Sequence, residues 1–339
     1  MIIVLKPGIT RRQESEVLKE IRSRGYRPHV MRGVARTVVG AIGDELTHAN
    51  LETLVAQFPR SVESVMPIQK RYKLVSREAH PANSTIRVRE HVLGGKQLHV
   101  MAGPCSVESE KQLLATAEAV KAAGATFLRG GAFKPRTSPY EFQGLGEKGL
   151  KLLAKARKET GLPVITELLS ENHAGLVAEY ADIIQIGARN AQNFQLLIAA
   201  AKTGKPVLLK RGLSMKIEEW LLAGEYVLAN ENPNLLFCER GIRTFETYTR
   251  NTLDLSTIPI IKRESHCPIV IDPSQGAGRA DLVAAMCKGA VAMGADALLI
   301  EVHPNPAEAW SDGAQQVSFA KFAELMQELK PFIVVAGRE

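Results

Sequence analysis

A short apolar run that leads directly into a basic loop is the unit that decides the fold. It is seen in the stretch Thr126-Phe127-Leu128-Arg129-Gly130-Gly131-Ala132-Phe133-Lys134-Pro135-Arg136-Thr137-Ser138. Arginine forks and lysine point charges suit carboxylate and phosphate oxygens, and glycine lets the backbone approach a ligand closely. The loop is therefore typical of a binding site for small phosphorylated anions. An ordinary solvated basic loop has the same composition, so the rest of the chain has to decide between the two interpretations.

The same unit recurs along the rest of the chain. Eight apolar runs, each followed by a polar loop and a helical stretch, lie at residues 99–102, 126–128, 164–166, 182–186, 207–209, 235–238, 268–271 and 297–300. Runs that are apolar throughout predict parallel strands buried on both faces. Eight strands alternating with helices over roughly 240 residues predict an α/β protein with a (β/α)8 TIM barrel. The main competitor, a doubly wound sheet, usually has fewer strands and a glycine-rich turn after its first strand.

A small domain is expected in front of the barrel, over residues 1–70. Strands at 2–5, 29–31, 37–42 and 62–68, with helices at 10–24 and 50–58, give the order β-α-β-β-α-β of a ferredoxin-like α+β domain. Nothing in this domain looks catalytic, so we expect it to sense a ligand or to mediate assembly. Residues 71–85 are expected to form a linker. The barrel domain is expected to span residues 86–339, and its first residues, 86–88, are expected to pair with 97–99 as a hairpin.

Composition limits the classes of function. The 339 residues, 45% hydrophobic and 23% charged, allow one large domain and one small one. A net charge of +7 suits acidic small substrates, while 5% aromatics and no long Lys/Arg run argue against nucleic acid. The cysteines lack Cys-x-x-Cys spacing, and neither a signal peptide nor a membrane-length apolar run is found. We therefore expect a cytoplasmic protein with reduced thiols and no membrane partner.

Basic side chains follow several of the expected strands directly. In a barrel, the carboxyl ends of the strands form one mouth, and the chemistry of such enzymes takes place there. Five cations are expected to converge on this mouth: Arg129, Lys134, Arg189, Lys210 and Arg240. Because like charges repel one another, an anionic ligand is expected to balance them.

A thiol and two carboxylates are expected at the same mouth. Cys105 follows the first strand, while Glu301 and Asp312 follow the eighth. A mixed sulfur and oxygen set suits a borderline divalent ion such as Mn, Fe, Co or Zn. A lone cysteine after a strand is also commonly buried and inert, so the spacing alone leaves both possibilities open.

Several long motifs, in the right order, resemble those of the 3-deoxy-D-arabino-heptulosonate 7-phosphate (DAHP) synthase family, type I beta. They are Gly103-Pro104-Cys105-Ser106, the stretch 128–138, Gln185-Ile186-Gly187-Ala188-Arg189-Asn190, Cys238-Glu239-Arg240-Gly241 and Asp272-Pro273-Ser274. The resemblance covers the whole barrel, and the N-terminal module is similar to the ferredoxin-like regulatory domain of that family. It implies a transferase that condenses phosphoenolpyruvate with erythrose 4-phosphate, the first step of the shikimate pathway. It also implies a divalent metal, a homo-oligomer (a tetramer) and an aromatic amino acid effector at the N-terminal domain.

The resemblance implies binding, metal-ligating and catalytic roles for the residues of this chain that match the family motifs. Phosphoenolpyruvate would be held by Arg129, Lys134, Arg189, Lys210 and Arg240, with Asp272 also in the substrate site. The aldose phosphate would be bound by Arg136, Thr137 and Ser138. The metal ligands would be Cys105, Glu301 and Asp312. Lys134 and Cys105 would act in catalysis, with Lys134 as a proton donor to the aldehyde-derived oxygen or only as a charge.

One position departs from the family pattern. The family carries Asp-Pro-Ser-His after the seventh strand, and that histidine ligates the metal, whereas Gln275 stands here. An amide oxygen is a harder and weaker ligand than imidazole for these ions. Three outcomes stay open: Gln275 coordinates the metal with altered preference, a water fills the place, or the metal is weak or absent and activity is low.

Two alternatives to DAHP synthase follow. One is a related condensing enzyme, 3-deoxy-octulosonate 8-phosphate synthase, which uses a longer sugar phosphate; the stretch Lys134-Pro135-Arg136-Thr137-Ser138 favours the shorter sugar. The other is a sensing paralogue whose catalysis is impaired by Gln275.

Overall fold

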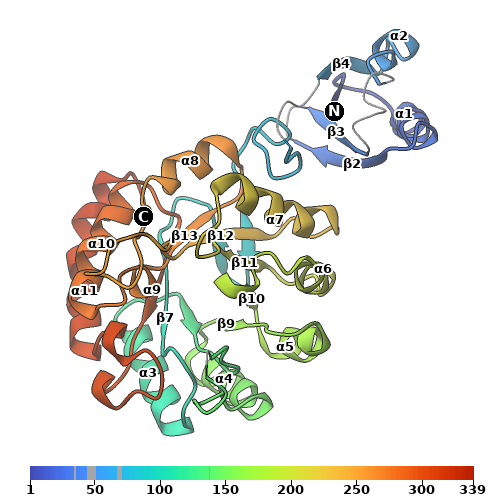
Figure 1. Cartoon of the computed structure of the whole chain (residues 1–339). Coiled ribbons are helices and arrows are strands. Elements are labelled where there is room, and N and C mark those ends of the chain that lie inside the picture. The colour runs from blue at the N-terminus through green and yellow to red at the C-terminus, as the bar shows by residue number, and fades with distance from the viewer. Residues whose placement is uncertain (34–35, 44–50, 67–70, 137) are drawn as a thin grey trace. The chain divides into compact units, whose positions relative to one another are not determined.

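The larger part of the molecule is a closed barrel of eight parallel strands (Figure 1). The structure is a computed structural model and describes residues 1–33, 36–43, 51–66, 71–136 and 138–339. The strands follow one another around the ring in chain order: β7 (His99–Gly103), β8 (Phe127–Arg129), β9 (Val164–Glu167), β10 (Ile183–Ile186), β11 (Val207–Lys210), β12 (Leu235–Glu239), β13 (Ile269–Ile271) and β14 (Ala297–Glu301). The predicted (β/α)8 barrel is thus confirmed.

Helices connect the strands and lie around the outside of the barrel (Figure 1). The longer ones are α3 (Glu110–Ala122), α4 (Glu147–Thr160), α5 (Ala174–Tyr180), α6 (Phe194–Lys202), α7 (Ile217–Ala229), α8 (Thr257–Glu264), α10 (Ala280–Ala292) and α11 (Phe319–Val335). Short segments are α9 (Pro273–Ala277), η2 (Glu171–His173), η3 (Ala188–Asn190), η4 (Pro306–Glu308) and η5 (Gly313–Gln315). Among the described residues, no helix has both the length and the apolar character needed to cross a membrane.

Alternation along the strands separates an apolar interior from a charged mouth. Side chains two residues apart on a strand point to the same face. The apolar cluster that fills the barrel includes Phe127, Leu208, Val270 and Leu299. Two residues beyond these, on the same faces, stand the charged residues Arg129, Lys210, Asp272 and Glu301. Each of these four strands therefore supplies a packing residue first and a functional candidate two residues later.

A two-stranded hairpin precedes the first barrel strand. It pairs β5 (Ile86–Val88) with β6 (His91–Leu93), so the expectation that residues 97–99 form its second strand is wrong. The reason is that His99 already belongs to β7, where it pairs with Ala297 of β14. Apolar side chains of the hairpin join the cluster inside the barrel, and the hairpin thus extends the barrel core.

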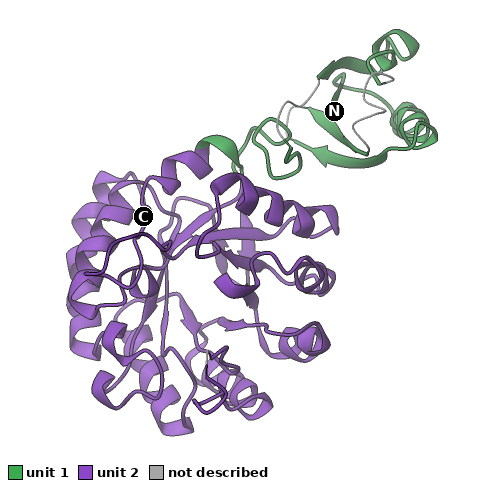
Figure 2. Ribbon diagram, in the orientation of Figure 1, with its two compact units in different colours: residues 1–83, 263–266 green, residues 84–262, 267–339 purple. Residues whose placement is uncertain are grey.

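The second compact unit comprises residues 1–83 and 263–266 (Figure 2). Its elements are β1 (Ile2–Leu5), α1 (Arg11–Ser23), β2 (Arg27–Arg32), β3 (Thr37–Ile42), α2 (Leu54–Gln57) and β4 (Val62–Met66). The strands form an antiparallel sheet in the order β2-β3-β1-β4, and the predicted ferredoxin-like fold is confirmed. The helix expected at 50–58 is shorter than predicted, with its described part at α2. Residues 44–50 and 67–70, where two of the predicted elements begin or end, lie outside the described residues.

Two helical glycines allow a matched test of the packing around the barrel. A Cβ added to Gly224 in α7 would stand 2.7 Å from Cζ of Phe237 and 2.8 Å from Cδ2 of Leu235, both on β12. A Cβ on exposed Gly175 in α5 would have nothing within 4 Å. We expect Gly224→Ala to destabilise the barrel by about 1–3 kcal/mol through overpacking, and Gly175→Ala to be neutral or stabilising by up to about 1 kcal/mol. Thermal unfolding measures the ranking, and equal melting temperatures would contradict it.

Candidate functional site

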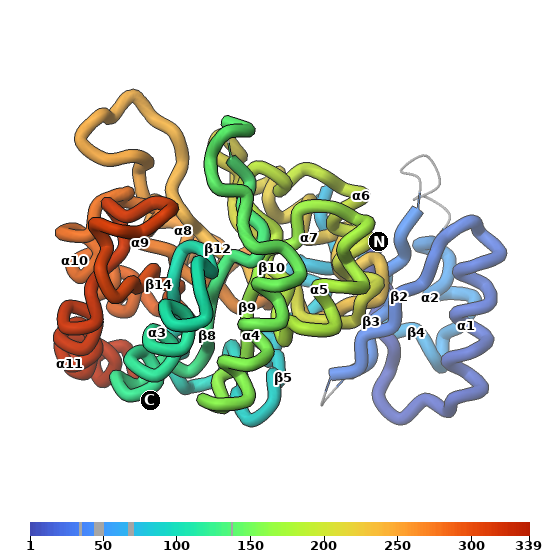
Figure 3. Tube along the Cα trace, turned by 90° about the horizontal axis from the view of Figure 1, so that it is seen from below, coloured from blue at the N-terminus to red at the C-terminus, as the bar shows by residue number. Residues whose placement is uncertain are grey.

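A cavity of about 410 Å³ lies at the carboxyl ends of the barrel strands. The loops that follow β8 and β12 extend from the same side of the barrel and border it (Figure 3). Seven lining residues are basic: Lys134, Arg136, Arg189, Lys210, Arg240, Arg243 and Arg250. Three are acidic: Glu141, Glu167 and Asp312. The excess of positive charge makes the cavity a site for anions.

The structure brings most of the predicted substrate residues to this cavity. Those that line it are Lys134, Arg136, Arg189, Lys210 and Arg240. Arg129 and Asp272 are buried and make contact with other site residues instead. Ser138 does not line the cavity, and its hydroxyl accepts a hydrogen bond from the amide of Tyr140 at 3.3 Å. Thr137 lies outside the described residues.

Arg129 is held by a buried carboxylate. Its Nη1 donates to Glu301 Oε1 at 2.8 Å and to the carbonyl oxygen of Pro104 at 2.9 Å. Burial by itself lowers the pKa of Arg129, but the charge of Glu301 outweighs this effect, and the pKa is raised. The guanidinium is therefore charged. Among the described residues, its buried Nε has no hydrogen-bond partner and is therefore an unused donor.

Lys210 and Arg240 meet at Gln275. Lys210 Nζ lies 2.6 Å from Asp272 Oδ2 and 3.3 Å from Gln275 Oε1. Arg240 donates to the same oxygen from Nε at 3.3 Å and from Nη2 at 3.2 Å. Among the described residues, no carboxylate oxygen lies within 4.0 Å of Arg240, and burial lowers its pKa. The charge of Lys210 is thus balanced by the carboxylate of Asp272, while the charge of Arg240 remains available for a ligand.

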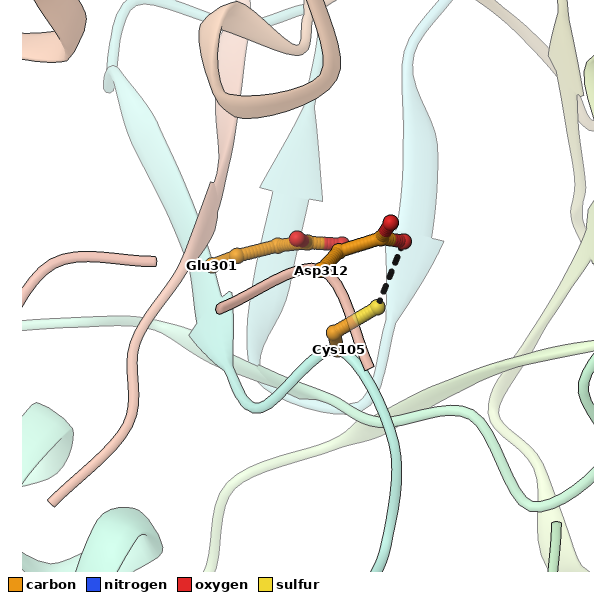
Figure 4. A group of neighbouring side chains, drawn as sticks. All are labelled: Cys105, Glu301 and Asp312. Carbon is orange, nitrogen blue, oxygen red and sulfur yellow. Dashed lines mark hydrogen bonds between the residues drawn. The ribbon is translucent and has the colours of Figure 1, made fainter. Parts of the chain in front are cut away.

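Cys105, Glu301 and Asp312 form a cluster of metal-ligand type (Figure 4). One ligand atom from each lies within 4.8 Å of the others. The Cys105 thiol donates to Asp312 Oδ2 at 3.3 Å, and Lys134 Nζ lies 3.0 Å from the same sulfur. Gln315 Nε2 donates to Glu301 Oε2 at 2.7 Å. The three residues come from the ends of β7 and β14 and from the loop after β14, as predicted from their order in the chain.

The cluster fits a divalent transition ion. Such ions bind thiolate at about 2.3 Å and carboxylate at about 2.0–2.2 Å, so two ligands of one ion lie at most about 4.5 Å apart. The observed spacing needs little contraction to reach this value. Burial raises the pKa of the Cys105 thiol to about 12, and a bound cation would take the place of that proton. A thiol with two carboxylates is a donor set for Mn, Fe, Co or Zn.

Residues that were not predicted complete the site. Arg250 Nη1 donates to Asp312 Oδ1 at 3.0 Å and to Gln315 Oε1 at 3.2 Å, so the loop after β12 holds a carboxylate of the cluster. Arg243, on the same loop, lines the cavity, as does Glu141, which pairs with Arg136 at 2.8 Å. The sequence prediction covered residues that closely follow a strand or belong to the family motifs, and it left out the other charged residues of the same loops. Counting every charged residue up to the next helix would have found all three.

Fold and site together define a (β/α)8-barrel enzyme for phosphorylated, multiply anionic substrates, with a metal-type cluster beside the anion site. Residues 81–334 match the model of the DAHP synthetase I family, and residues 1–70 match that of the DAHP synthase ferredoxin-like domain. The chain belongs to the DAHP synthetase I family. The family predicted from the sequence motifs is confirmed.

Known relatives agree with this placement. The chain is 51% identical to phospho-2-dehydro-3-deoxyheptonate aldolase of Thermotoga maritima, over 99% of both sequences. A crystal structure of the Thermotoga maritima enzyme superposes with a TM-score of 0.79 at 49% identity, covering 100% of this chain and 98% of that one. A truncated form of the Thermotoga maritima synthase matches 79% of this chain with a TM-score of 0.75. The 2-dehydro-3-deoxyphosphooctonate aldolase of Caulobacter vibrioides is 33% identical, over 74% of this chain and 91% of that protein.

Removing the thiol tests the metal assignment. We expect Cys105→Ala to abolish the sulfur-to-metal charge-transfer absorption of the Co²⁺-loaded protein and to lower its metal affinity at least tenfold, because a ligand is lost. Cys287→Ala is the matched control, since Cys287 is also fully buried but lies in α10, outside the cluster. Cobalt titration followed by absorption and by equilibrium dialysis measures both effects. An unchanged spectrum in Cys105→Ala would contradict the assignment.

Proposed function

We propose that the chain condenses phosphoenolpyruvate with erythrose 4-phosphate to give DAHP and inorganic phosphate, the first step of the shikimate pathway. The observation that carries the proposal is the junction, in one barrel mouth, of a cationic wall and a thiol–carboxylate cluster. The cationic wall suits two phosphorylated substrates. A metal ion held by the thiol–carboxylate cluster would suit an aldehyde oxygen. Identity of 51% over nearly the whole chain to a phospho-2-dehydro-3-deoxyheptonate aldolase supports the same reaction.

Different residues bind the two substrates. Phosphoenolpyruvate is held by Arg129, Lys134, Arg189, Lys210 and Arg240, and Asp272 orients Lys210 through their 2.6 Å contact. The aldose phosphate is bound by the loop after β8, with Arg136, Thr137 and Ser138 as its contacts. Cations that are fixed before the reaction stabilise negative charge as the C–O bond to phosphate breaks.

The chemistry proceeds in two stages. In the first, the enol carbon of phosphoenolpyruvate bonds to the aldehyde carbon while the C=C and C=O π bonds break, and the aldehyde-derived oxygen takes up a proton. In the second, water adds to the carbon that bears the phosphate ester and gives up a proton, and the C–O bond to phosphate breaks to release inorganic phosphate. A divalent ion, Mn, Fe, Co or Zn, held by Cys105, Glu301 and Asp312 would supply Lewis-acid polarisation of the aldehyde. Lys134 gives a proton to the aldehyde-derived oxygen. Its ammonium lies beside the metal-type cluster, 3.0 Å from Cys105 Sγ and 3.2 Å from the carbonyl oxygen of Cys105.

A substrate panel separates this reaction from the longer-sugar condensation. With phosphoenolpyruvate held fixed, we expect phosphate release with erythrose 4-phosphate at a kcat/KM at least tenfold above that with arabinose 5-phosphate. The octulosonate relative has lower identity, 33% over 74% of the chain, which favours the shorter sugar. Preference for arabinose 5-phosphate would overturn the assignment. No phosphate release with either sugar, in metal-loaded protein, would favour the impaired sensing paralogue.

The N-terminal unit is proposed to regulate the barrel. Its match to the DAHP synthase ferredoxin-like domain supports this role, and an aromatic amino acid is the proposed effector of a cytoplasmic homotetramer. A chain that begins at Ser84, the first residue of the barrel unit, is expected to keep catalysis and lose inhibition. Activity with and without phenylalanine, tyrosine or tryptophan measures this for both chains. Equal inhibition of the two would place the effector site in the barrel.

A further inference from the structure

Gln275 lies in the cavity wall, on the short helix α9, and its backbone is fixed from both sides. Its amide nitrogen donates to Asp272 Oδ1 at 2.9 Å, and its carbonyl oxygen accepts from Asn251 Nδ2 at 2.9 Å. These two bonds anchor the backbone from which the side chain projects. The backbone position of Gln275 is therefore set by the turn between β13 and α9 and by the loop after β12.

The side-chain oxygen of Gln275 is fully engaged. It accepts three hydrogen bonds, one from Lys210 Nζ at 3.3 Å and two from Arg240 at 3.3 and 3.2 Å. An amide oxygen has two lone pairs, and three cationic N–H donors already occupy them. Coordination of a metal by this oxygen would require breaking the contacts to both cations.

A neutral acceptor has a specific advantage at this position. Two cations that face one substrate repel each other, and their side chains are flexible. A carboxylate between them would fix both but would also cancel charge that an anionic ligand needs. An amide oxygen accepts hydrogen bonds from both and leaves the charge of Arg240, which has no carboxylate within 4.0 Å among the described residues, for the ligand.

We propose that Gln275 is a positioning residue: it orients Lys210 and Arg240 for the carboxylate and phosphate of phosphoenolpyruvate, and the metal is held by three protein ligands only. The inference rests on the proposed function and goes beyond it. It assigns Gln275 to substrate affinity, and it leaves Cys105, Glu301 and Asp312 as the complete protein share of the metal site.

Gln275→Met tests the proposal, because methionine keeps the length of the side chain and removes the acceptor. Calorimetric titration of metal-free protein with phosphoenolpyruvate is expected to show affinity reduced about tenfold or more, the usual effect of losing hydrogen bonds to charged groups. In steady-state kinetics, KM for phosphoenolpyruvate rises and KM for erythrose 4-phosphate stays within twofold. Affinity for Mn²⁺ or Co²⁺ alone, measured by equilibrium dialysis, also stays within twofold. Gln192→Met, at an exposed glutamine that does not line the cavity, is the matched control.

Gln275→Glu provides the second variant, and it keeps an acceptor of nearly the same shape. Phosphoenolpyruvate affinity is expected to fall at least as far as in Gln275→Met, because the new carboxylate competes with the ligand for the two cations. This variant decides the matter alone if Gln275→Met does not fold. Unchanged phosphoenolpyruvate affinity in a folded variant overturns the positioning role.

The metal measurement decides the other half of the proposal. A metal affinity that falls more than tenfold in Gln275→Met, with phosphoenolpyruvate affinity intact, would make Gln275 a ligand and overturn the inference.

The unmodified chain separates this failure from a failure of the proposed function. If it releases phosphate from phosphoenolpyruvate and erythrose 4-phosphate, the function stands whatever the Gln275 variants do; if it does not, the function itself fails.

Discussion

The buried ion pair between Arg129 and Glu301 is the interaction on which the rest of the mouth depends. Its atoms lie 2.8 Å apart, and the side chains are 5% and 1% exposed. The two residues end β8 and β14, the strands on either side of β7. Removing one partner of such a pair typically costs about 3–5 kcal/mol, because the other is left as an uncompensated buried charge. Since Glu301 also belongs to the thiol–carboxylate cluster, the anion site and the metal-type site share one carboxylate.

Charge in the mouth is balanced only in part by the protein. Asp272 pairs with Lys210, and Glu301 pairs with Arg129. Even so, the described residues that line the cavity include seven basic and three acidic side chains. The cations of the wall come from the ends of β8, β10, β11 and β12 and from the loops that follow them, so they are spread around the mouth. Phosphorylated substrates bring negative charge that offsets this excess, so the same charges that limit stability supply binding energy. The neutral amide of Gln275 fits this design, because it orients cations without cancelling them.

Much of the fold could be predicted from the sequence because of the way barrel strands are buried. Parallel barrel strands are buried on both faces, so they appear as continuous apolar runs, and residues such as Lys210 and Glu301 follow these runs directly. The hairpin partner was mispredicted because residues 91–93 and 97–99 are both short and suited to strands, and only the barrel register assigns His99 to β7. The contacts of Gln275 and Arg250 depend on loop closure and side-chain conformation, which no local pattern encodes.

A crystal structure of the full chain soaked with phosphoenolpyruvate, without metal, tests the central claim most directly. We expect the ligand's phosphate and carboxylate to lie within hydrogen-bonding distance of Lys210, Arg240 and Arg189, with the oxygen of Gln275 still bonded to the first two. Phosphoenolpyruvate bound elsewhere in the cavity would contradict the account, as would an amide of Gln275 turned away from both cations.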